Sequence, residues 1–68
     1  MSYRLAILLF FKNSYLKDAD RWFSVKDVSK VMSLSINRAR SHLTFLVLER
    51  ELETKVDGWS NIYKLKKR

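Results

Sequence analysis

The sequence contains no cysteine and no proline, and Gly58 is its only glycine. Without cysteine the chain has neither a disulfide framework nor a thiolate metal site, and an intracellular location fits this composition. A single glycine excludes the Gly-rich loop with which many nucleotide-binding proteins hold phosphate. These absences remove redox chemistry and phosphate-loop chemistry from the functions to be considered.

Histidine is almost as scarce, since His42 is the only one. A transition-metal site would have to combine this one imidazole with carboxylates alone, which is a poor ligand set. A hydrolytic triad would need the same histidine beside an activated serine and an orienting acid, whereas the serines fall at predicted helix caps, turns and one polar helix face. The sequence therefore predicts a protein that is not an enzyme and has no metal or other cofactor.

No apolar run is long enough to cross a membrane. The run from Leu5 to Phe11 has seven residues, whereas a spanning helix needs about 20, and no small-residue cleavage site of a secretory signal accompanies it. At 68 residues the chain has room for one domain with a thin core, which a second subunit would help to stabilise. We expect a single soluble, cytoplasmic domain that does not interact with membranes.

Acidic residues are few relative to basic ones. The chain has 14 Lys and Arg against 7 Asp and Glu, which gives a formal charge of +7. Such an excess favours a polyanionic partner, and nucleic acid before a membrane surface. Because a chain this short has no separate ligand domain, no small-molecule effector is expected.

The first segment, residues 1–17, has no helix breaker and predicts a helix with apolar residues on both sides. One side carries Leu5, Leu8, Leu9, Tyr15 and Leu16, and the other carries Ile7, Phe10 and Phe11. One interpretation is that both sides are buried within a monomer. Since so small a domain has little other mass to cover two faces, we instead predict a homodimer. The predicted dimer interface comprises Ile7, Phe10, Phe11, Phe45 and Leu48.

The middle of the chain predicts two helices joined by a tight turn. Ser24 and Asp27 form the capping-box pattern that opens a helix over 24–32. Ser35 is the expected N-cap of a longer helix over 35–50. One side of this longer helix is apolar, whereas a polar stripe recurs at the helical repeat on another side. The members of this stripe are Asn37, Arg40, Ser41 and Thr44.

The remaining residues predict a β-hairpin over 52–65 and a basic tail over 66–68. The Asp57-Gly58 pair is a common hairpin signal, and the segments that flank it have the composition of strands. With the helices that precede it, this hairpin gives a fold that is mainly α with a small β-hairpin, in the α+β class.

The run Val28–Ser35, followed by His42, Leu43 and Leu46, resembles the helix-turn-helix of winged-helix DNA-binding proteins. In that family an apolar helix leads through a Leu-Ser turn into a helix with a His-Leu-x-x-Leu pattern, and a hairpin called the wing follows. The resemblance covers Phe23–Leu65. It implies a winged helix-turn-helix of three helices and a C-terminal two-stranded wing.

Three residues depart from the family pattern. Ser33 occupies the turn position where these proteins often carry glycine, so we expect either a less comfortable backbone conformation there or a different turn. Phe45 and Leu48 are apolar, whereas the last turns of the family's recognition helix tend to be polar. We expect these two side chains to lie under the first helix of a partner subunit or against the wing.

The resemblance implies that the helix over 35–50 enters the major groove of double-stranded DNA, with the wing on the backbone or in the minor groove. Arginine can donate two hydrogen bonds to guanine, and asparagine pairs in the same way with adenine. We predict that the bases are read by Asn37, Arg40, Ser41 and Thr44. The predicted backbone contacts are Ser35, Arg38, Lys26, Lys30, Lys55, Trp59, Ser60, Asn61 and Lys64, and the tail adds attraction without sequence choice.

Two classes of function remain open. The first is a transcription regulator that binds DNA as a homodimer, with half-sites about 10 bp apart. The second is a protein-interaction module that uses the apolar face of the first helix with Phe45 and Leu48, and RNA binding through the basic surface is a variant. Without other motifs, a polar stripe would indicate only a helix face exposed to solvent. Within this order of motifs it favours the DNA-binding regulator.

Overall fold

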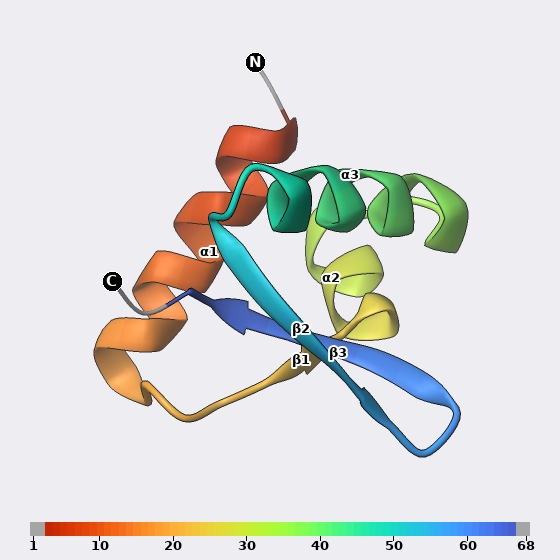
Figure 1. Ribbon diagram of the computed structural model, residues 1–68. Helices are drawn as coiled ribbons and strands as arrows, with labels where there is room; N and C mark the ends of the chain where they lie inside the picture. Colours follow the sequence, from red (N-terminus) through yellow and green to blue (C-terminus); the bar gives the residue numbers. More distant parts are fainter. Residues whose placement is uncertain (1–2, 67–68) are drawn as a thin grey trace.

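The computed structural model describes residues 3–66, which form three helices and a three-stranded antiparallel sheet (Figure 1). In chain order the elements are α1 (Tyr3–Lys17), β1 (Phe23–Ser24), α2 (Val25–Met32), α3 (Ile36–Leu48), β2 (Leu52–Asp57) and β3 (Ser60–Leu65). The predicted α+β fold with three helices and a C-terminal hairpin is confirmed. The prediction that Lys67 and Arg68 attract DNA concerns residues outside the described range.

The sheet contains one strand more than the predicted wing. β1 pairs with β3, with Phe23 opposite Tyr63, so the strand order is β1-β3-β2. A strand of two residues has no periodicity of its own, and only its pairing with a distant segment reveals it. In the hairpin, Gly58 is the first of the two loop residues and has a φ of 63°. A positive φ at this position is what a type II′ turn requires.

Both helices of the helix-turn-helix begin where the sequence predicts. The amide of Asp27 donates to Ser24 Oγ at 3.2 Å, and the amide of Ser24 donates to Asp27 Oδ2 at 3.1 Å, which confirms the capping box. The amide of Arg38 donates to Ser35 Oγ at 3.2 Å, which confirms Ser35 as the N-cap of α3. Each hydroxyl pairs an amide that the first helical turn would otherwise leave unpaired.

The turn between α2 and α3 contains the expected strained residue. Ser33 has a left-handed backbone, with φ 54° and ψ 43°. The amide of Leu34 donates to the carbonyl of Ser29 at 3.0 Å, and the amide of Ser33 donates to that of Lys30 at 3.4 Å, as in a Schellman motif. The hydroxyl of Ser29 donates in turn to the carbonyl of Leu34. These bonds hold Ser33 in the left-handed conformation, which at this position of a helix end is usually adopted by glycine.

We expect Ser33→Gly to raise the free energy of unfolding by about 0.5–1 kcal/mol. The left-handed conformation costs an L-residue about 1–2 kcal/mol, and relieving this cost is partly offset because the greater freedom of glycine stabilises the unfolded chain by about 0.4–1 kcal/mol. Urea denaturation of the variant and the wild type measures the difference. Ser33→Ala keeps the Cβ atom and is the control, which should show no gain. A lower stability for Ser33→Gly would contradict this account of the turn.

α3 ends at Leu48, two residues before its predicted end. Arg50 follows with a left-handed backbone of φ 62°. The amides of Arg50 and Glu51 donate to the carbonyls of Val47 and Leu46, both at 3.0 Å. This is again the Schellman pattern, here without the glycine that would have marked the helix end in the sequence.

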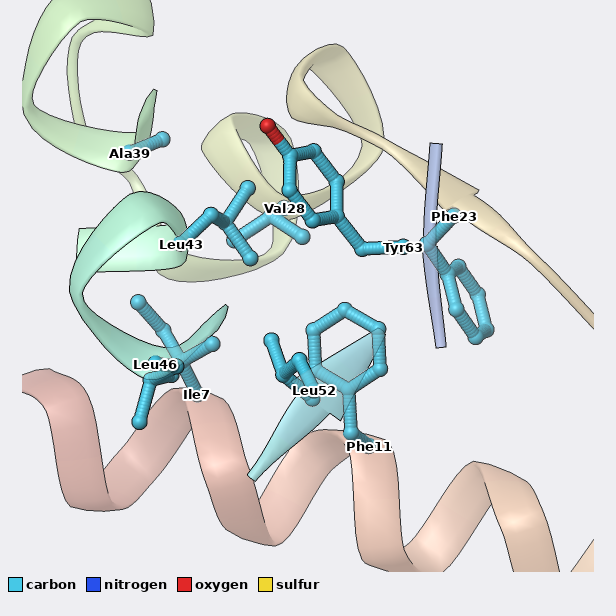
Figure 2. Packing of buried hydrophobic residues seen from close by; sticks show 9 residues of the cluster. All are labelled: Ile7, Phe11, Phe23, Val28, Ala39, Leu43, Leu46, Leu52 and Tyr63. Carbon is cyan, nitrogen blue, oxygen red and sulfur yellow. The ribbon is translucent and has the colours of Figure 1, made fainter. Parts of the chain in front are cut away.

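One hydrophobic core joins the helices to the sheet (Figure 2). Figure 2 shows side chains from α1, α2, α3 and all three strands pointing into the same cluster. The aromatic rings of the cluster meet edge to face, with 4.8 Å between the centroids of Phe10 and Phe23 and 5.5 Å between those of Phe11 and Phe23. The buried residues are Ile7, Phe11, Phe23, Val28, Ala39, Leu43, Leu46, Leu52 and Tyr63.

α1 turns toward the core the side that was predicted to meet a second subunit. Ile7 and Phe11 are 0% and 2% exposed, so the prediction that they form a dimer interface is wrong. Phe10 is partly buried and packs against the same core. The pattern of residues could not decide this, because both sides of the helix are apolar and only the fit against α3 and the sheet selects one. The exposed side carries Leu5, Leu9 and Leu16.

Candidate nucleic-acid interface

α3 has one buried side and one exposed side, as the sequence predicts. Ala39, Leu43 and Leu46 are buried against the rest of the domain. The helical repeat places Asn37 and Ser41 on the opposite side. All four residues of the polar stripe, Asn37, Arg40, Ser41 and Thr44, are exposed to solvent. In Figure 1 the first turn of α3 and the tip of the wing both point away from α1, with α2 between them.

A groove of about 400 Å³ lies between α3, the start of α2 and the wing. From the helices it receives the cationic residues Lys26 and Arg40, and from the wing the polar residues Ser60 and Asn61. Cations on one wall and hydrogen-bonding groups on the other suit the sugar–phosphate backbone of a nucleic acid. The lining consists of Ser24, Val25, Lys26, Ile36, Arg40, Trp59, Ser60 and Asn61.

Thr44 lies further along α3 and faces the hairpin. It lines a second depression, of about 280 Å³, together with residues of β2 and β3. Asn61 lines both this depression and the groove, so it connects them. The side of α3 that carries Arg40 and Thr44 is therefore the side nearest to the wing.

The other flank of α3 faces α1. Arg38 and His42 line a depression there together with Asn37 and Ser41. His42 is half-buried, and its ring centroid lies 6.1 Å from that of Tyr3. Arg38 is exposed and does not line the groove that adjoins the wing.

One predicted backbone contact of α2 is separated from the groove. Lys30 lines a depression between α1, α2 and β1 that also contains Lys17 and Arg21. Lys26, by contrast, lines the groove beside α3. The structure thus divides two lysines that the sequence placed on the same helix with the same predicted role.

Two predicted backbone contacts of the wing, Lys55 and Lys64, do not line the groove, although Lys55 lines the second depression beside Thr44. The side chain of Tyr63 is buried in the core, and because side chains alternate along a strand, Lys64 points to the opposite face of the sheet. The ammonium groups of Lys55 and Lys64 lie 4.4 and 5.0 Å from the ring centre of Trp22. Lys64 also pairs with Glu53 at 3.8 Å. The sequence carries no signal for this contact of Trp22 with the two lysines, because it depends on the pairing of β1 with β3.

Within residues 3–66, no three histidine or acidic side chains come close enough together to hold a metal ion. None of the helices in this range has the length and apolar character needed to cross a bilayer. The buried residues of the range are all apolar or aromatic, so its charged side chains lie at the surface.

The helices α2 and α3 form a helix-turn-helix, and the β2–β3 hairpin that follows forms a wing whose strand β3 also pairs with β1. This arrangement is that of a winged helix-turn-helix protein. No protein-family model matches the sequence, and no curated protein matches it. Solved structures do match. Reduced HlyU from Vibrio cholerae N16961 aligns with a TM-score of 0.75 and 24% identity, over 98% of this chain and 63% of that one.

Two further solved structures are similar. A HOP2 structure, described in terms of its DNA recognition and protein interaction domains, aligns with a TM-score of 0.77 and 22% identity over 96% of this chain and 100% of that one. A possible transcriptional regulator from Methanosarcina mazei Go1 aligns with a TM-score of 0.72 and 22% identity over 100% of this chain and 57% of that one. This chain spans less than two thirds of the HlyU and Methanosarcina chains. The likeness establishes the winged-helix fold.

Proposed function

We propose that this protein binds double-stranded DNA through α3 and the wing and regulates transcription. The observation that carries the proposal is the juxtaposition of an exposed polar stripe on α3 with a groove that holds Lys26 and Arg40. The net charge of +7 supports a polyanionic partner. Two of the similar structures support the same class, since one is described by its DNA recognition and the other as a possible transcriptional regulator.

In this proposal α3 lies in the major groove and reads base edges. Asn37 and Arg40 supply the bidentate pairings that adenine and guanine accept, and Ser41 and Thr44 meet neighbouring base edges. Lys26 and the wing residues Ser60 and Asn61 hold one backbone strand in the groove. Ser35 and Arg38 contact phosphates at the start of α3, where the helix dipole favours an anion.

Salt dependence of binding tests the proposal. Duplexes selected from a random pool are measured at several salt concentrations, and the affinity is expected to fall with a slope of about −0.9 in log–log form for each phosphate contact. Lys26→Ala should reduce that slope by about 1, because it removes a contact in the groove. Lys30→Ala is the matched control on the other side of α2 and should leave the slope unchanged. Affinity that does not vary with salt would contradict DNA binding through this surface.

The protein is further proposed to act as a homodimer through α1. Leu5, Leu9 and Leu16 fall on one side of the helix and are 56%, 51% and 83% exposed. Phe45 and Leu48, which remain from the predicted interface, are 40% and 77% exposed at the end of α3. An apolar surface of this kind on a small domain is typical of an interface. A dimer would present two copies of α3 to half-sites about 10 bp apart.

Leu9→Asp is expected to convert the dimer into a monomer at micromolar concentration, because it places a charge in the apolar stripe that Leu5, Leu9 and Leu16 form on α1. Sedimentation equilibrium measures the change. Val31→Asp is the control, since Val31 is an exposed apolar residue of α2 outside the stripe, and that variant should remain a dimer. A wild-type protein that is monomeric under these conditions would contradict the dimer.

The same stripe supports a second candidate, a protein-interaction module. In that case the wild type would be monomeric, and binding to a protein partner would be lost in Leu9→Asp but kept in Arg40→Ala. Binding to duplex DNA would then be weak for every sequence. An RNA duplex added as competitor tests the alternative of RNA binding. If the protein binds RNA through this surface, the RNA duplex should displace bound DNA as effectively as unlabelled DNA does.

A further inference from the structure

Trp59 lies at the tip of the wing and is fully exposed. It shares the two-residue loop with Gly58, so no neighbouring side chain of the loop covers its ring. The other tryptophan, Trp22, is half-buried beside two lysines. Its indole is a large flat apolar surface that stands uncovered at the tip of the hairpin and beside the groove that holds Lys26 and Arg40, where a bound partner could cover it.

The groove beside α3 positions this side chain relative to a duplex. Trp59 lines that groove together with Lys26 and Arg40 from the helices. In B-DNA a single sugar–phosphate strand separates the major groove from the minor groove. With α3 in the major groove and that strand held in the groove of the protein, the tip of the wing lies over the adjacent minor groove.

The charge at the tip disfavours the backbone contact that the sequence predicts for Trp59. Asp57 lies opposite Ser60 in the strand register and is exposed, so its carboxylate repels phosphates in the backbone and on both sides of the minor groove, and only the ring of Trp59 can make a favourable contact at the tip. Neither Gly58 nor Trp59 carries a cation. The chemistry of the tip is therefore that of a flat apolar surface, which suits the faces of the bases better than the backbone.

We propose that Trp59 is a minor-groove wedge that stacks against one base step and partly unstacks it. Apolar side chains inserted in this way kink a duplex toward the major groove. Because every base has a π-face, the contact does not select a base, but opening a step costs least at flexible TA and CA steps. The wing then reads the deformability of the DNA while α3 reads base edges. This inference rests on the proposed function, since it needs a duplex held against α3.

Fluorescence and bending of the selected duplex test the wedge. In a Trp22→Phe variant Trp59 is the only tryptophan, and its emission is expected to be quenched when duplex DNA binds. Energy transfer between dyes at the two duplex ends should report a bend with the wild type and no bend with Trp59→Ala. Trp59→Ala is expected to weaken binding about tenfold, as for the loss of one base–aromatic stack, whereas Trp59→Phe should retain most of the affinity.

The outcomes separate this inference from the proposed function. If the wild type binds no duplex, the proposed function fails. If Trp59→Ala binds and bends the same duplexes as the wild type, with no quenching of Trp59, the wedge is overturned while DNA binding stands. Weakened binding without a change in bending would also overturn the wedge. Because Trp59 is fully exposed, its variants should melt at the wild-type temperature, which separates loss of contact from loss of fold.

Discussion

Phe11→Ala is expected to lower the free energy of unfolding by about 3–5 kcal/mol. Phe11 is 2% exposed, and its ring meets those of Phe10 and Phe23 in the core. Removing it leaves a cavity in a domain of 68 residues, whose total stability is expected to be small. Most of the variant should therefore be unfolded at room temperature.

Circular dichroism during urea denaturation measures this loss. Val31→Ala is the control, since Val31 is 53% exposed on α2 and lies outside both the core and the proposed dimer surface. That variant should stay within about 0.5 kcal/mol of the wild type. If Phe11→Ala kept its stability and instead dissociated a dimer, α1 would face the core with the side that carries Leu5 and Leu9, and the fold described above would be wrong at this helix.

Arg40→Ala is expected to cost about 1–3 kcal/mol of binding free energy on the selected DNA site. Arg40 is exposed on the flank of α3 nearest to the wing, where a guanidinium can donate two hydrogen bonds to guanine. On random duplexes the loss should be smaller, because only the electrostatic part of the contact remains there. Gel-shift titrations of both kinds of duplex at one salt concentration measure the difference.

Arg38→Ala is the control for this second prediction. It removes the same charge from the same helix, but from the flank that faces away from the wing. A phosphate contact there predicts an equal loss on the selected site and on random DNA. Equal losses for Arg40→Ala as well would remove base reading by Arg40 from the proposal and leave it as a backbone contact.

The sequence by itself determined the local features of this fold. The capping hydroxyls of Ser24 and Ser35, the strained turn at Ser33 and the hairpin at Gly58 all depend on residues within a few positions of one another. The polar stripe of α3 is likewise set by the helical repeat, and each of its members proved to be exposed. Their roles on DNA remain predictions.

Only the tertiary structure decided which side of α1 is buried, because both sides are apolar and the choice depends on how Ile7 and Phe11 fit against residues far along the chain. It also paired β1 with β3, and it separated Lys26, which shares a groove with Arg40 and the wing, from Lys30. Local hydrogen bonds and helical periodicity can be predicted from residues that are close together in the sequence. The space available to a side chain in the core cannot be predicted in this way, because it is set by all the elements that pack there.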